Sequence, residues 1–117
     1  MISELSAVEA REHLHRFITE SIKVEAFFAG NGIDASVVGL LRLNPDGQYC
    51  VKQAGASGAH LSVNPKNFSA GKFADKSSVP ELSPLGVLVP LDEFSSALTF
   101  KMKDDSVFSL FEIAKAN

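Results

Sequence analysis

The sequence has one cysteine, no tryptophan and no apolar run as long as the roughly 18 residues that a transmembrane helix needs. A single cysteine excludes an internal disulfide framework, and we expect a cytoplasmic protein with no membrane segment. The N-terminus lacks the basic and apolar regions of a signal peptide. The net charge of −3 argues against broad, non-specific binding of nucleic acids, which needs a surplus of Lys and Arg. A local site of a few stacking and hydrogen-bonding groups stays open.

Motifs for catalysis, metals or cofactors are also missing from the sequence. His13 and His15 lie two positions apart on a predicted helix, so they point in different directions and cannot share a metal ion. Cys50 has no Cys or His at a ligand spacing, and we expect it in the core. The glycine-rich stretch 55–58 lacks the Lys-Ser/Thr ending of a phosphate-binding loop. We therefore expect a protein that is not an enzyme and that has neither a metal nor a cofactor.

The length of 117 residues predicts one domain, spanning 1–117, with a core of its own. Residues 4–20 predict an N-terminal helix, in which Ser6 and Glu9 have capping-box spacing. Apolar side chains recur there at steps of three and four, which predicts one buried stripe: Ala7, Ala10, Leu14, Phe17 and Ile18. We expect this helix to pack across an open end or face of a sheet.

Residues 22–63 predict a β-meander. Asn31-Gly32 between two apolar runs is typical of a type I′ hairpin turn, because both residues accept a positive φ. On the face expected to point into the core, that turn pairs Phe28 with Ala35, Ala26 with Val37, Val24 with Gly39, and Ile22 with Leu41. Gly39 inside the second strand indicates a bend, a bulge or the close approach of another backbone.

Residues 66–85 predict an irregular insertion. Lysines alternate there with two phenylalanines, a pattern that can bind single-stranded nucleic acid through base stacking and phosphate contacts: Lys66, Phe68, Lys72, Phe73 and Lys76. The alternative is a long surface loop that the two phenylalanine side chains hold against the domain. Both interpretations stay open at this point.

Residues 86–114 predict the C-terminal strands, with an edge strand near Pro90 and a final hairpin closed by Asp104-Asp105. That two-residue turn would pair Met102 with Val107, Phe100 with Ser109, and Leu98 with Phe111. Phe108 and Leu110 would then lie on the opposite face. We expect a partner subunit or the N-terminal helix to cover them, so they are the candidate oligomer interface.

The helix and meander together resemble the Sm-like family. The resemblance is carried by three stretches: 24–33 with its Asn-Gly turn, 37–41 with its internal glycine, and 49–52 after a polar turn. It covers about residues 8–65. It implies a mainly β fold, namely a strongly bent, antiparallel, five-stranded SH3-like barrel behind an N-terminal helix.

The resemblance also implies a function. Sm-like subunits join edge to edge into homo-oligomeric rings and bind single-stranded RNA, which would give Asn44 and His60 base-contacting roles. With Lys72 and Phe73 from the lysine–phenylalanine stretch, these are the candidate RNA-binding residues. One alternative is an SH3-like structural or protein-interaction module that binds no nucleic acid. A second alternative is a small enzyme on an unrelated α+β fold.

Overall fold

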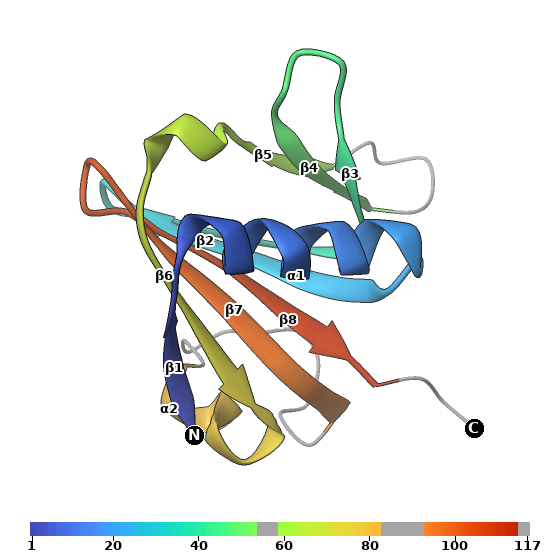
Figure 1. Cartoon of the computed structure of the whole chain (residues 1–117). Helices are drawn as coiled ribbons and strands as arrows, with labels where there is room; N and C mark the ends of the chain where they lie inside the picture. Colours follow the sequence, from blue (N-terminus) through green and yellow to red (C-terminus); the bar gives the residue numbers. More distant parts are fainter. Residues whose placement is uncertain (54–58, 83–92, 115–117) are drawn as a thin grey trace.

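The protein is one open, antiparallel sheet of eight strands in the order β1-β6-β7-β8-β2-β3-β4-β5 (Figure 1). The computed structural model describes residues 1–53, 59–82 and 93–114. The strands are β1 (Ile2–Leu5), β2 (Lys23–Gly30), β3 (Ile33–Leu43), β4 (Tyr49–Gln53), β5 (His60–Val63), β6 (Phe68–Asp75), β7 (Phe94–Met102) and β8 (Val107–Ile113). The predicted five-stranded barrel is therefore wrong, because the sheet keeps two edges, at β1 and β5.

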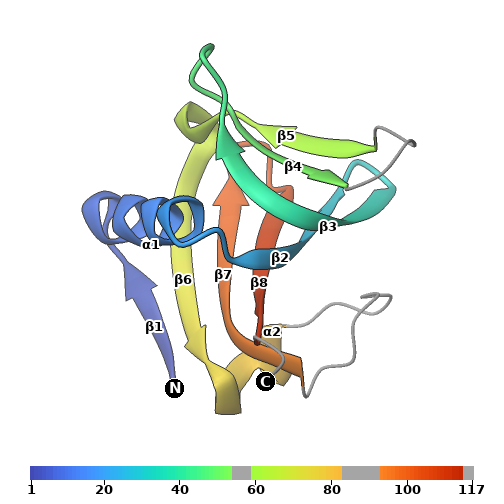
Figure 2. The ribbon, with the colours of Figure 1, turned by 90° about the vertical axis from the view of Figure 1, so that its right-hand side faces the viewer.

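The sheet bends sharply, and helix α1 (Ala7–Thr19) lies along its inner side. Figure 2 shows β6, β7 and β8 upright, β3 to β5 across the top, and α1 beside the angle between them. The predicted capping box is confirmed, since Ser6 and Glu9 each accept the backbone N–H of the other. The predicted start at residue 4 is too early, because Ile2–Leu5 pairs with β6 instead.

The first hairpin has the predicted register. Phe28 lies opposite Ala35 and Val24 opposite Gly39, while Asn31 and Gly32 have φ values of 52° and 76°. Gly39 marks the close approach of another backbone, because a Cβ built on it would overlap the Lys52 carbonyl oxygen. The hairpin turn thus fixes which face of β2 and β3 points inward.

The predicted register of the last hairpin is wrong by one residue. Its loop has three residues, 103–105: Met102 donates to the Ser106 carbonyl oxygen, and Asp105 adopts a φ of 68°. A left-handed third residue is typical of three-residue hairpin loops. The extra loop residue places Phe108 opposite Phe100 and Leu110 opposite Leu98, both fully buried inside this chain.

The predicted irregular insertion at 66–85 contains regular structure. Strand β6 pairs along its length with β7 on one side, and residues 71–74 of it pair with β1 on the other. Its sequence is rich in Ala, Gly, Lys and Ser, which are poor strand formers, so neighbouring strands rather than propensity specify it. The predicted edge strand near Pro90 and the glycine-rich stretch 55–58 lie outside the described residues.

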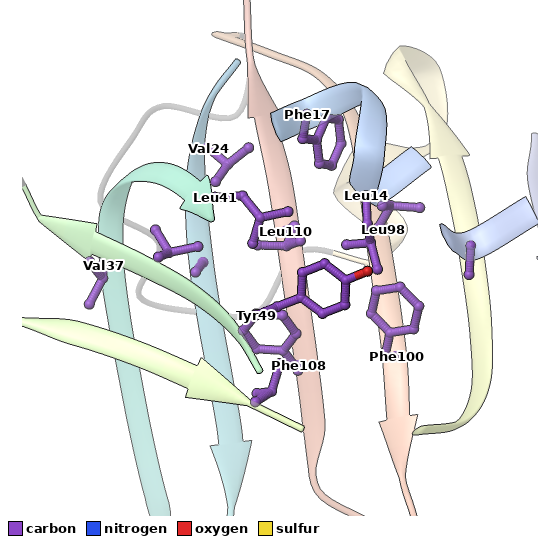
Figure 3. Close-up of a cluster of buried hydrophobic side chains, with 14 of the residues drawn as sticks. Leu14, Phe17, Val24, Val37, Leu41, Tyr49, Leu98, Phe100, Phe108 and Leu110 are labelled. Atoms are coloured by element: carbon purple, nitrogen blue, oxygen red, sulfur yellow. The ribbon is translucent and has the colours of Figure 1, made fainter. Parts of the chain in front are cut away.

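Two apolar clusters hold the sheet, one on each face. The inner cluster joins α1 to the bent sheet and includes Leu14, Phe17, Tyr49, Phe100 and Leu110 (Figure 3). The outer cluster lies where the short helices η2 (Lys76–Ser78) and α2 (Val79–Leu82) cross β7, and its residues are Phe27, Ala74, Val79, Phe94, Ala97 and Phe111. The chain itself covers both faces of the sheet. This explains why the central strands carry apolar side chains on both faces.

Candidate ligand-binding cavity

A cavity lies where the bent sheet fails to close. The short helix η1 (Pro65–Asn67) joins β5 to β6, and the N-terminal half of α1 lies across this open region. The space between them, which we call the α1 cavity, has a volume of about 200 Å³. Its lining comes from β1, α1, β4, η1, β6 and β7: Leu5, Ser6, Ala7, Ala10, Arg11, Leu14, Tyr49, Pro65, Phe68, Ser69, Ala70, Gly71 and Phe100.

The cavity follows from the size gradient along the apolar stripe of α1. Leu14 and Phe17, toward the C-terminal end, are large and buried, and they fill the angle of the sheet. Ala7 and Ala10, one to two turns earlier on the same side, are small and line the cavity. Side chains as large as leucine at these two positions would fill this space, whereas the two alanines leave it open.

Tyr49 supplies the polar group of the cavity. Its side chain is 5% exposed and points inward from β4, with the hydroxyl directed toward Leu14 and Phe100 (Figure 3). No hydrogen bond to this hydroxyl is found among the described residues. No fully buried side-chain nitrogen or oxygen of the described residues lacks a hydrogen-bond partner. The Tyr49 hydroxyl is therefore not fully buried, and a water or ligand in the cavity can contact it. Burial raises the pKa of Tyr49, against a smaller opposing effect of Arg11, so the hydroxyl stays protonated at neutral pH and can donate.

Arg11 lies at the rim of the cavity. Its side chain is exposed and makes no ion pair within the described part of the chain. The guanidinium is close enough to Tyr49 to affect the pKa of its hydroxyl. A guanidinium presents a rigid fork of donors that matches a carboxylate. The rim cation and the inner hydroxyl together form a polar end of the cavity, while the hydroxyls of Ser6 and Ser69 already hydrogen-bond to the chain itself.

Two stacked rings and a glycine form the apolar wall. Phe68 and Phe100 stack with their centroids 4.3 Å apart and their planes 9° from parallel. Gly71 lies opposite Phe100 in the sheet, and a Cβ built there would lie 3.2 Å from two ring atoms. The glycine therefore lets the Phe100 ring lie flat against β6 and keeps the cavity wall in place.

Interactions on the far side of the cavity hold α1. Arg16 donates to Glu112 at 2.7 Å, and Ser96 donates to the same carboxylate oxygen at 2.9 Å. Burial raises the pKa of Glu112, but these donors and the Arg16 charge together lower it by more, so the pKa lies below its usual value. The His13 ring stacks on Phe73 at 4.6 Å, and burial, together with the Arg16 charge, lowers the pKa of His13. The helix is thus anchored at its middle and C-terminal half.

The four predicted RNA-binding residues do not meet. Asn44 closes the turn between β3 and β4 through backbone hydrogen bonds to Gly47 and Gln48, while His60 lies near the other end of β4, opposite Lys52. Lys72 and Phe73 are neighbours on β6 and so point to opposite faces, Phe73 inward onto His13. None of the four lines the α1 cavity. RNA binding stays a prediction, without a common site formed by these residues.

Sequence reasoning missed the residues that form the cavity. Tyr49 and Arg11 are far apart in sequence and belong to a strand and a helix whose contact depends on how the sheet bends. The available signal was the pair of small residues, Ala7 and Ala10, in an otherwise large apolar stripe. Among the described residues there is no group of His, Cys, Asp and Glu that could hold a metal ion, and no helix long and apolar enough to cross a membrane. Comparison with known protein families, curated proteins and solved structures found no significant match.

Proposed function

We propose that this protein binds a small carboxylic acid with an apolar body in the α1 cavity, and that it acts by binding rather than by catalysis. The observation that carries the proposal is the Tyr49 hydroxyl, which is almost buried, faces the cavity and has no hydrogen-bond partner among the described residues. A ligand oxygen would give this hydroxyl a hydrogen bond inside the cavity, which contributes about 0.5–1.5 kcal/mol net.

The volume limits the size of the ligand. A cavity of about 150 Å³ with apolar walls accommodates a benzene ring. The α1 cavity, at about 200 Å³, suits one substituted ring or a short alkyl chain. Drug-sized ligands usually occupy at least about 300 Å³ and are too large. The apolar body would lie against Leu14, Phe68 and Phe100, and the carboxylate would lie between Tyr49 and Arg11.

The small contact area also limits the affinity. For a ligand of about eight non-hydrogen atoms, roughly −0.7 kcal/mol per atom gives a binding free energy near −5.6 kcal/mol. That corresponds to a Kd on the order of 10⁻⁴ M. Binding of this strength is measured reliably by NMR titration of the labelled protein.

The test is a titration of ¹⁵N-labelled protein with benzoate and hexanoate, and with benzamide and hexanol as uncharged controls. We expect the acids to shift amide signals of residues 5–14 and 68–71 and of Tyr49, and the uncharged analogues to bind at least tenfold more weakly. Tyr49→Phe and Arg11→Gln should each weaken acid binding about tenfold, equivalent to about 1.4 kcal/mol. Arg42→Gln, which removes an exposed arginine outside the cavity, is the matched control.

Two results would refute the proposal. The first is an unchanged spectrum at millimolar benzoate and hexanoate. The second is binding that is equally strong in Tyr49→Phe and in the original protein. Ala10→Leu provides a further check, because the added side chain should occupy the cavity and block binding while the spectrum stays that of a folded protein.

The other expectations from the sequence keep their status as proposals. A cytoplasmic location, suggested by the single cysteine, fits a ligand drawn from metabolism. Homo-oligomerisation and single-stranded RNA binding were implied by the Sm-like resemblance, and the open sheet removes the barrel on which that resemblance depended.

A further inference from the structure

A row of cations crosses the outer face of the sheet, away from the α1 cavity. Lys23 on β2 lies directly opposite Leu40 on β3, and Leu40 lies opposite Lys52 on β4. Arg42, two residues beyond Leu40, points to the same face. These side chains and Val38 line a broad hollow of about 910 Å³. We call this surface the basic hollow.

Among the described residues, no acidic side chain lines the basic hollow. Lys23, Arg42 and Lys52 are exposed and form no ion pair with any described residue. On the same face, Glu25 is fully buried and accepts a hydrogen bond from Ser36 at 2.6 Å. Asp34 lies six residues from Leu40 along β3, or about 20 Å away. The chain as a whole carries −3, so this local surplus of positive charge runs against its overall charge.

The centre of the hollow is apolar. Leu40 is 37% exposed although it lies in the middle of a long strand, and Val38 next to it is half-buried. A large aliphatic side chain between two lysines favours a partner with an apolar residue between two acids. A single strand of RNA needs rings on which bases stack, and no aromatic side chain from the described part of the chain lines this hollow. A hollow also cannot insert apolar groups into a lipid surface as a protruding loop would.

We propose that the basic hollow binds an acidic amphipathic helix of a partner protein. Lys23 and Lys52 are two strand spacings apart, about 10 Å. Acidic residues at positions i and i+7 of a helix are about 10.5 Å apart along its axis, and the residues at i+3 and i+4 lie between them on the same face. Such a helix lying across β2, β3 and β4 places its acids on the two lysines and its apolar residue on Leu40. Arg42 can then bind a further acid beside that row.

The test uses a fluorescent, helix-stapled peptide with Glu at i and i+7 and Leu at i+3 and i+4, measured by fluorescence anisotropy at about 50 and 500 mM salt. We expect binding that weakens at high salt. Leu40→Ser and the double variant Lys23→Glu/Lys52→Glu should each weaken it at least tenfold. The matched control is Lys66→Glu/Lys76→Glu, which reverses two exposed lysines elsewhere and should leave binding unchanged.

A charge swap makes the test independent of folding defects. A peptide with Lys in place of both Glu residues should bind the Lys23→Glu/Lys52→Glu variant better than it binds the original protein. Equal binding of the acidic peptide to that variant and to the original protein would overturn the proposal. So would tighter binding of a ten-nucleotide single-stranded RNA, or of vesicles with phosphatidylserine, through the same lysines.

Discussion

Gly39→Ala tests the path of the bent sheet at its tightest point. The two backbones of β3 and β4 approach so closely that a Cβ on Gly39 would overlap the Lys52 carbonyl oxygen. This carbonyl belongs to the ladder between the two strands and cannot turn away as the end of a side chain could. The substitution must therefore push β4 outward and disturb Val51, whose side chain is fully buried.

The expected cost can be worked from these contacts. One buried backbone hydrogen bond left unmade costs about 1–3 kcal/mol, and crowding around Val51 adds about 1 kcal/mol. Gly→Ala restricts the unfolded chain, which returns about 0.4–1 kcal/mol. We expect a net loss of about 2–3 kcal/mol in the free energy of unfolding. With a urea dependence of about 1.5 kcal/mol per molar, the unfolding midpoint should fall by roughly 1.3–2 M.

Gly47 provides the matched control, because it needs glycine for a different reason. Its φ is 85°, and no atom of the described residues lies within 4 Å of a Cβ built there. Gly47→Ala should therefore cost about 1 kcal/mol from the left-handed backbone alone. Gly47→Asn should cost less, because asparagine tolerates that conformation, whereas Gly39→Asn should cost more than Gly39→Ala. If Gly39→Ala unfolded at the same urea concentration as the original protein, the close approach of β3 and β4 would be wrong.

Two further predictions follow from the core and from the titrating groups. Leu110→Ala should lower the free energy of unfolding by about 2–5 kcal/mol in urea, against at most about 0.5 kcal/mol for the exposed Leu43→Ala; a stable Leu110→Ala protein with altered mass in light scattering would instead favour an interface role. The free energy of unfolding should fall as the pH drops below 6.5, because burial lowers the pKa of His13 in the folded protein and the unfolded chain takes up the proton first. It should fall again below pH 4.5, because the pKa of Glu112 is also lowered in the folded protein and protonation of this carboxylate therefore favours unfolding. Thermal unfolding at pH 7.5, 5.5 and 3.5 measures both steps, and His13→Gln should flatten the first.

The parts of the fold that were predicted correctly depend on residues close in sequence. The Asn31-Gly32 turn fixes the register of the first hairpin through backbone conformation alone, and Ser6 with Glu9 fixes the start of α1. The last hairpin shows the limit of such signals. Asp104-Asp105 reads as a two-residue turn, yet the left-handed residue is Asp105 in a three-residue loop, and that one residue moves Phe108 and Leu110 to the other face.

Strands specified by distant partners were missed. Strands β1 and β6 have little strand propensity of their own: β6 forms on the edge of β7 and β1 on the edge of β6, which no local pattern in the sequence reports. The closed barrel was wrong for the same reason, since closure depends on whether the last edges meet. Ala7 and Ala10 were the one local signal for the α1 cavity, and its place and lining could not be predicted because it occupies the space that those unmet edges leave.

This origin of the cavity links the fold to the proposed function. A bent sheet that does not close needs a cover for its open side, and α1 provides it with a stripe that changes from large to small side chains. The large half, with Phe17 and the Arg16–Glu112 ion pair, fixes the helix to the sheet. The small half leaves room beside Tyr49 and places Arg11 at the rim. One half of α1 thus anchors the helix and the other half lines the cavity. Ala10→Leu should therefore abolish acid binding without lowering the free energy of unfolding, whereas Phe17→Ala should lower it by about 3–5 kcal/mol.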